Sequence, residues 1–111
     1  MRYMLLICED PSAEAVPEDG LDAATEAWVE EMDGRGVRKV GDRLRPASDA
    51  TTVRVRDEGV LLSDGPFAET REQIAGFDLI ECEDLDEAVG VASRHPMARY
   101  GMIEVRPFWE G

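Results

Sequence analysis

Two short stretches, Arg2 to Cys8 and Gly76 to Cys82, are apolar on both faces of the strand that each would form. Side chains alternate between the two faces of a strand, so Met4 and Leu6 lie opposite Leu5. Strands of this kind are typical of the middle of a sheet that is covered on both faces. The sequence therefore predicts two central strands, and any fold of this chain must cover both faces of the sheet they form.

Apolar residues at helical spacing predict two helices. Asp19 or Asp22 is placed to cap the first, and Gly34 and Gly36 to end it. Its stripe consists of Leu21, Ala24, Trp28 and Met32. The second begins with Asp84 and stops before Pro96. Its stripe consists of Leu85, Ala88, Val89 and Ala92. Trp28 and Met32 are expected in the core rather than against a ligand.

The other β segments are Val37 to Val40, Thr52 to Arg56, Val60 to Ser63 and Met102 to Phe108. The middle two would form a hairpin. The order contains two strand–helix–strand units with right-handed crossovers. It predicts an α+β fold, a ferredoxin-like sandwich with an inserted β-hairpin and both helices on one face. An uncovered apolar face usually marks an interface, so we expect two sheets to pack as a homodimer, a dimeric α+β barrel.

Length and charge limit the domain count and the partners. The 111 residues show no break in composition, which predicts one domain over residues 1–111. A net charge of −13 repels phosphate backbones, so we expect no nucleic-acid partner. The longest apolar run near the start is too short to span a membrane and lacks the features of a secretory signal. We expect a cytoplasmic protein with no membrane contact.

Basic residues cluster between Arg35 and Arg45, directly after an acidic stretch. We interpret them as partners of that acidic helix, with an anion site as the alternative. Cys8 and Cys82 are far apart in sequence and are expected to be small buried hydrophobes. A single histidine excludes a histidine-rich metal site, and we expect neither a metal nor a cofactor.

The loop that begins at Asp64 is the most unusual stretch. Gly65 can adopt a positive φ, Pro66 fixes its own φ, and Phe67 can anchor the loop in the core. Asp64 either closes a turn by accepting backbone N–H groups or serves as a general acid or base at a pocket. Both interpretations stay open at this point.

The other polar candidates have structural alternatives as well. His95 follows the second helix, where it either bonds the last carbonyls and favours the helix dipole or takes part in catalysis. Glu69, Arg71 and Glu72 follow the loop closely. Either one of them faces the pocket, or they form a solvated charged turn with local ion pairs. Phe108 and Trp109 are expected to close over a partner subunit or a pocket.

The run from Ser63 to Glu81, SDGPFAETREQIAGFDLIE, closely resembles the signature of the DGPF-domain family, a branch of the YCII-related proteins. The resemblance continues in residues 3–7, 52–54, 85–88, 95–96 and 103–107, and so covers nearly the whole chain. It implies a ferredoxin-like fold, homodimers of the dimeric α+β barrel type and a cleft near the motif. Related proteins pair a His near the first helix with an Asp. Here that stretch has no imidazole, so a dyad would have to recruit His95 or use two carboxylates.

Two classes of function follow. The first is cofactor-free lyase or isomerase chemistry on a small cyclic molecule in a dimer cleft, since one related enzyme class removes halide from chlorinated hydroquinones. Asp64 and His95 would be catalytic. The residues expected to contact the substrate are Gly65, Pro66, Phe67, Glu69 and Arg71. The alternative is a non-catalytic small-ligand-binding or regulatory dimeric module, which the scarcity of catalytic residue types favours.

Overall fold

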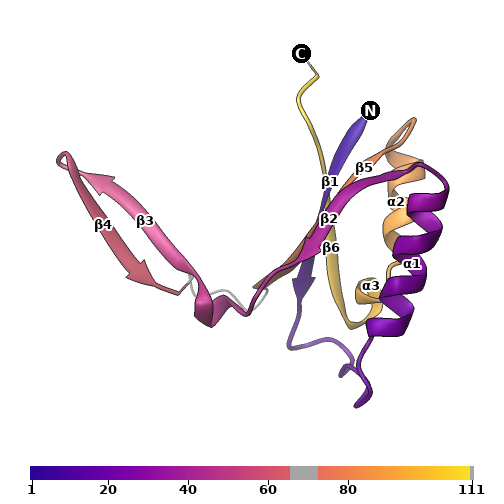
Figure 1. Cartoon of the computed structure of the whole chain (residues 1–111), viewed down its shortest axis with the longest axis horizontal. Coiled ribbons are helices and arrows are strands. Elements are labelled where there is room, and N and C mark those ends of the chain that lie inside the picture. The colour runs from indigo at the N-terminus through magenta and orange to yellow at the C-terminus, as the bar shows by residue number, and fades with distance from the viewer. Residues whose placement is uncertain (66–72, 111) are drawn as a thin grey trace.

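The fold is mixed α+β, in a computed structural model that describes residues 1–65 and 73–110 (Figure 1). One antiparallel sheet has four strands in the order β2-β5-β1-β6. These strands are β1 (Arg2–Glu9), β2 (Arg38–Arg43), β5 (Gln73–Glu81) and β6 (Gly101–Pro107). The helices α1 (Asp22–Gly34), α2 (Leu85–Ser93) and α3 (Met97–Tyr100) lie on one side of this sheet. The strand order is consistent with a ferredoxin-like fold.

The core lies between the sheet and the helices. Leu5 from the central strand β1 and Ile80 from β5 are fully buried there, together with Met32 from α1. Trp28 is also buried, and its Nε1 donates a hydrogen bond to the carbonyl oxygen of Val91 in α2 at 3.0 Å. The predictions that Trp28 and Met32 belong to the core, and that Cys8 and Cys82 are buried, are confirmed.

The start of α1 differs from the sequence prediction. Leu21 is the N-cap residue, and no side chain accepts a hydrogen bond from the first turn, so the predicted cap by Asp19 or Asp22 is wrong. Ala24, which was placed in the apolar stripe, is exposed. The buried positions of α1 are Trp28 and Met32, which are four residues apart and therefore on one face of the helix.

The cap of α2 matches the prediction, but its buried face does not. The Asp84 side chain accepts a hydrogen bond from the backbone N–H of Glu87 at 2.9 Å. Leu85 and Val89 are exposed, whereas Val91 is buried with Ala88 and Ala92. Positions 88, 91 and 92 form one helical face at i, i+3 and i+4, so the face that meets the core is rotated from the predicted one.

The basic residues after α1 pair with acidic residues of that helix. Arg35 lies 3.5 Å from Glu31, and Arg38 lies 3.2 Å from Asp33. The interpretation that this cluster balances the acidic helix is therefore confirmed for these pairs. Exposed pairs of this kind contribute little stability each.

A separate two-stranded hairpin, β3 (Thr51–Arg56) with β4 (Gly59–Asp64), projects away from the sheet on the side opposite the helices, after a single 3-10 turn (Ala47–Asp49) (Figure 1). Asp57 and Glu58 have positive φ angles of 50° and 63°, as a tight hairpin turn requires. The radius of gyration is 15.8 Å, whereas a compact domain of this length has about 13 Å. The projecting hairpin accounts for the difference.

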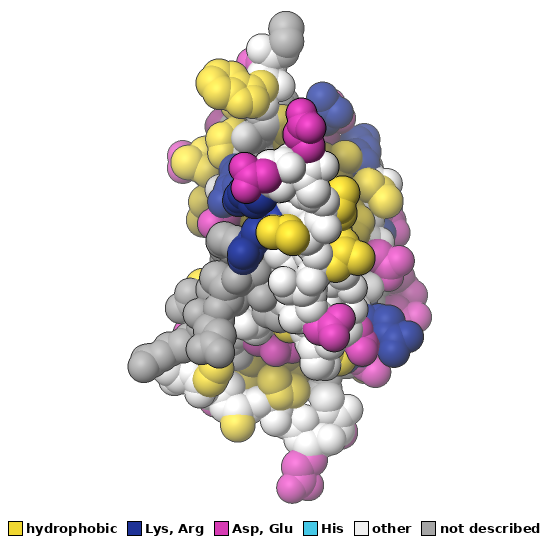
Figure 2. Space-filling model, turned by 90° about the vertical axis from the view of Figure 1, so that its left-hand side faces the viewer, with side chains coloured by type: hydrophobic (Ala, Val, Ile, Leu, Met, Phe, Trp, Pro, Cys, Tyr) yellow, Lys and Arg dark blue, Asp and Glu magenta, His cyan; other side chains and the backbone are white. Residues whose placement is uncertain are grey.

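The hairpin and the second face of the sheet both present apolar side chains. The exposed apolar side chains of the hairpin are Val53, Val55, Val60, Leu61 and Leu62. On the sheet, Met4 and Leu6 are half-buried, as are Phe77 and Leu79, which confirms that β1 and β5 are apolar on both faces. Figure 2 shows hydrophobic side chains at the surface on the hairpin side, with acidic and basic ones between them. Within residues 1–65 and 73–110, no helix is long and apolar enough to cross a membrane.

Candidate functional site

A cavity of about 1140 Å³ lies on the helix side of the sheet. Its walls come from the loop after β1, from α1, from β2 with the segment that follows it, from the first half of β5, and from the region of α3. Val29 and Ile7 contribute apolar surface. The volume suits a small organic ligand, because ligand pockets usually enclose several hundred to about a thousand cubic ångströms.

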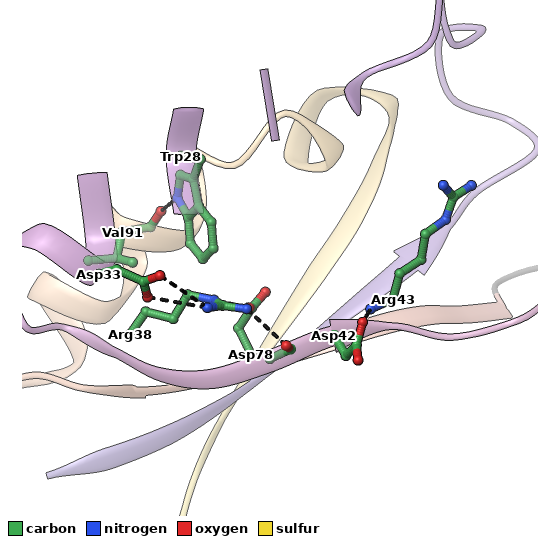
Figure 3. A network of polar contacts seen from close by, with 8 residues as sticks. Trp28, Asp33, Arg38, Asp42, Arg43, Asp78 and Val91 are labelled. Atoms are coloured by element: carbon green, nitrogen blue, oxygen red, sulfur yellow. Dashed lines mark hydrogen bonds and ion pairs between the residues drawn. The ribbon is translucent and has the colours of Figure 1, made fainter. Parts of the chain in front are cut away.

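A buried carboxylate, Asp78, lines this cavity and is only 5% exposed. Asp78 lies in β5 opposite Leu5 of β1 and Gly41 of β2, so its side chain points to the helix side. Its Oδ1 accepts a hydrogen bond from Nε of Arg38 at 2.7 Å (Figure 3). Its Oδ2 makes no hydrogen bond with any described residue and retains contact with solvent. One oxygen is therefore fixed and the other is open.

The Arg38 guanidinium is held by three acceptors. It donates to Asp78, to the carbonyl oxygen of Gly41 at 2.9 Å and to Oδ1 of Asp33 at 3.2 Å (Figure 3). Its side chain is 15% exposed, so the bonds to Asp78 and Gly41 are partly shielded from water, whereas Asp33 is 50% exposed. A planar guanidinium with this set of partners has one stable orientation. Arg38 therefore fixes the position of the Asp78 carboxylate.

Burial raises the pKa of the Asp78 carboxyl above its ordinary value, although the hydrogen bond and the charge of Arg38 act in the opposite direction. A nearby negative charge on Asp33 adds to the increase. Asp78 is consequently a stronger proton acceptor than a free aspartate when it is ionised. Its open oxygen faces the cavity in which a ligand would lie.

His95 lines the same cavity and is 5% exposed. Its Nδ1 accepts a hydrogen bond from the backbone N–H of Met97 at 3.0 Å. Its ring meets the ring of Trp28 edge to face, with centroids 4.7 Å apart. Desolvation lowers the pKa of His95 from 6.5 to about 4, so the imidazole is neutral at physiological pH. Nδ1 thus accepts from Met97 and does not donate to a carbonyl oxygen at the end of α2. The roles of His95 at the helix dipole and in catalysis stay predictions.

Carboxylates outnumber basic groups in the lining. The acidic residues that the structure describes there are Glu9, Asp10, Glu14, Asp22, Glu26, Asp42 and Asp78. The basic ones are Arg38, Arg43 and Arg45. Arg43 and Arg45 lie at the rim, with side chains 84% and 85% exposed. No group of three or more His, Cys, Asp or Glu side chains in the described ranges is placed to hold a metal ion.

Comparison with known proteins identifies the family. The family model of the YCII-related domain matches residues 1–110. This chain belongs to the YCII-related family. The resemblance that the sequence predicted is therefore confirmed. A similar protein is an uncharacterized protein of Rhizobium meliloti (strain 1021), which is 39% identical over 103 residues, covering 78% of this chain and 83% of that protein.

The predicted site residues of this YCII-related domain are not all at the cavity. Asp64 is the exposed last residue of β4, pairs with Thr51 across the hairpin, and does not line the cavity. Gly65 has the predicted positive φ, 86°, and its carbonyl oxygen accepts a hydrogen bond from the Thr52 hydroxyl at 2.8 Å. Pro66, Phe67, Glu69 and Arg71 lie outside the described residues. The roles proposed for these residues stay predictions.

The YCII-related chain also has a site residue that the sequence prediction did not include, Asp78. Arg38 was predicted only as a member of the basic cluster that pairs with the acidic helix or holds an anion. Asp78 interrupts an apolar strand at a position that alternates with the outward Phe77 and Leu79. A charged residue on the buried face of a strand is the signal that could have drawn attention to it. Trp109, expected to cover a partner or a pocket, is 97% exposed and does not line this cavity.

Proposed function

We propose that this YCII-related domain binds a small, cyclic organic molecule in the cavity beside α1 and moves a proton on it. Asp78 is the base in this proposal, and Arg38 is the residue that positions it. The observation that carries the proposal is the buried carboxylate of Asp78, which has one oxygen bound to Arg38 at 2.7 Å and one oxygen open. A base needs such a free oxygen within reach of the proton that it removes.

The chemistry is of the lyase or isomerase type and proceeds without a cofactor. Oδ2 of ionised Asp78 takes a proton from the ligand, and the electron pair left behind stays on the ligand as an enolate-type anion. In an isomerisation, protonated Asp78 returns the proton to a different atom of the ligand. In an elimination, the electron pair forms a double bond and expels a leaving group. The raised pKa of Asp78 favours the proton removal in both cases.

A homodimer is a second part of the proposal. Two apolar surfaces lie away from the helices: the side of the sheet around Leu6 and Leu79, and the hairpin with Val53 and Leu62. Exposed apolar surfaces of this kind usually mark an interface. A second copy packed against this side, in the manner of a dimeric α+β barrel, would supply it. The predicted catalytic role of Asp64 belongs here, because Asp64 would reach a cavity only in a partner protomer.

The non-catalytic alternative uses the same cavity. In a binding module, Asp78 and Arg38 would orient a ligand without any proton transfer. Proton transfer leaves a trace that binding alone does not: in D2O, a substrate exchanges C–H for C–D. The experiment is therefore incubation of the protein in D2O with a panel of cyclic enolisable carbonyl compounds, followed by mass spectrometry.

The decisive variants are Asp78→Asn and Asp42→Asn. Both remove one carboxylate from the cavity lining, but Asp42 is exposed, and among the described residues it bonds only the backbone N–H of Arg43. We expect Asp78→Asn to lower the exchange rate by about 10²- to 10⁴-fold while Asp42→Asn leaves it within a few-fold. Equal rates in the two variants would refute Asp78 as the base. Binding of a panel compound with no exchange in the wild type would favour the binding module.

A further inference from the structure

We propose that His95 is the hydrogen-bond donor of the cavity, and that the ligand is an uncharged or cationic molecule presenting a carbonyl-type oxygen to its Nε2–H. This inference rests on the proposed function for the location of the ligand, but not on proton transfer by Asp78. It assigns to the imidazole the role of a fixed neutral donor, in place of the partner of an Asp in the His–Asp dyad that the family resemblance implies.

The hydrogen bond at Nδ1 sets the tautomer. The backbone N–H of Met97 donates to Nδ1 at 3.0 Å, so Nδ1 presents a lone pair and carries no proton. A neutral imidazole has a single N–H, which is then on Nε2. A protonated ring would have an N–H at Nδ1 facing the N–H of Met97, which is unfavourable. The contact with Met97 therefore holds His95 in the neutral form with its donor at the far side of the ring.

That donor has no hydrogen-bond partner among residues 1–65 and 73–110. Nε2 makes no hydrogen bond with any described residue, and it keeps some contact with solvent although His95 as a whole is 5% exposed. His95 lines the cavity, and from this we infer that Nε2 faces it. Buried donors in proteins are nearly always paired, so a donor left open in a cavity indicates a ligand acceptor.

The ring is also held in a fixed orientation. Trp28 packs edge to face against it at 4.7 Å, and Trp28 is itself fixed by the hydrogen bond from its Nε1 to Val91 at 3.0 Å. Two helices thus hold the imidazole before a ligand arrives. A donor that needs no reorientation on binding loses little conformational entropy.

The charge of the lining decides which acceptors fit. A carboxylate or phosphate ligand would enter a cavity in which acidic side chains outnumber basic ones. The deepest cation there, Arg38, already bonds Asp78, Gly41 and Asp33. The neutral His95 supplies a donor but no positive charge. The excess of carboxylates in the lining repels an anionic ligand. A ketone, lactone or amide oxygen accepts the hydrogen bond from His95 without being repelled.

The single histidine of the chain makes the test direct, because the imidazole of the ¹⁵N-labelled protein gives one set of NMR signals. At pH 7 we expect the signal pattern of the neutral Nε2–H form. Cyclohexanone should shift the Nε2 and Hε2 signals in a saturable manner at millimolar concentration. Cyclohexanecarboxylate, which has the same ring and a negative charge, should bind at least tenfold more weakly.

Two variants distinguish the hydrogen-bond donor at Nε2 from the structural contact of Nδ1 with Met97. His95→Gln keeps an amide N–H near the place of Nε2, whereas His95→Asn keeps a polar atom near Nδ1 for Met97 and loses the far donor. We expect His95→Gln to bind cyclohexanone within a few-fold of the wild type and His95→Asn to lose at least tenfold. Binding is followed in both by the backbone amide signals of Val29 and Ala75, which line the cavity, and thermal melts verify folding.

Several results would overturn the inference. They are an Nδ1–H tautomer at pH 7, no shift of Nε2 with cyclohexanone, or a carboxylate that binds as tightly as the ketone. These outcomes differ from failure of the proposed function. If Asp78→Asn abolishes deuterium exchange but Nε2 does not respond to the ketone, the donor role of His95 is wrong. If Nε2 responds but Asp78→Asn exchanges normally, the error lies in Asp78 as the base.

Discussion

Gly41 lies directly opposite Asp78 across the β2–β5 pair, and a Cβ at position 41 would collide with the Asp78 carboxylate. The same Cβ would lie 2.7 Å from the carbonyl oxygen of Phe77, so the backbone leaves it no room. The absence of a side chain at this one position lets the carboxylate lie beside β2, where Arg38 binds it.

Gly41→Ala is therefore expected to displace Asp78 and break its bond with Arg38. Breaking a buried ion pair costs about 3–5 kcal/mol, and the partial exposure of Arg38 places the expected loss in the free energy of unfolding near the lower value. Urea denaturation measures it. The control is Gly34→Ala, since a Cβ at that position meets nothing within 4 Å. A similar small change in both variants would contradict the steric account.

Arg38→Met is expected to destabilise the protein more than the double variant Arg38→Met with Asp78→Leu. The single variant leaves an uncompensated buried carboxylate, which costs about 3 kcal/mol, whereas removing both charges leaves none. Denaturation of the wild type, both single variants and the double variant gives the coupling free energy. If the two substitutions were simply additive, the bond between Arg38 and Asp78 would carry no net interaction.

The stability of the protein should fall as the pH is lowered from 6.5 to about 4. Unfolded His95 takes up a proton below its ordinary pKa of 6.5, whereas the native imidazole stays neutral until about pH 4. The unfolded state therefore binds more protons in this window, and the loss reaches about 3 kcal/mol at its lower end. Above pH 6.5 this contribution to stability is fully present.

His95→Gln isolates that effect. The raised pKa of Asp78 acts with the opposite sign, because native Asp78 takes up its proton at a higher pH than the unfolded chain does. The variant keeps Asp78 and lacks only the imidazole, so the difference between the two pH profiles reports His95. Parallel profiles of the wild type and the variant would show that His95 titrates normally in the native state.

Light scattering tests the proposed homodimer. The wild type is expected at twice the monomer mass of 12.3 kDa at micromolar concentration. Leu62→Glu should shift it toward the monomer, because Leu62 is 67% exposed on the hairpin and would meet the second copy. Leu85→Glu is the matched control, since Leu85 is 52% exposed at the start of α2, on the helix side of the sheet. A monomeric wild type would refute the dimer outright.

Local patterns predicted most of the fold. The two strands with apolar residues on both faces, the Asp84 cap and the buried Trp28 follow from spacing within a few residues, which is where sequence patterns are informative. The sequence did not predict which face of α2 is buried. Ala88 and Ala92 can share an apolar face either with Leu85 and Val89 or with Val91. Packing against the sheet decides between such orientations.

The candidate site was less accessible to prediction. The partners Arg38 and Asp78 are 40 positions apart and meet only through the register of β2 with β5, which shifts between Arg38 and Val40. The environment of His95 also depends on a residue far away in sequence, Trp28 of α1, whose ring packs against the imidazole. The Asp64 loop has an unusual local sequence, but long-range pairing of strands and helices determines which groups line the cavity.

The contact of Trp28 with His95 also makes the indole an optical reporter of the cavity. Trp28 is buried, whereas the second tryptophan, Trp109, is 97% exposed, so their emission bands differ in wavelength. An imidazolium quenches a neighbouring indole far more strongly than a neutral imidazole does. The short-wavelength fluorescence should thus stay bright down to about pH 4, and a ligand that bonds Nε2 changes it without any label being attached.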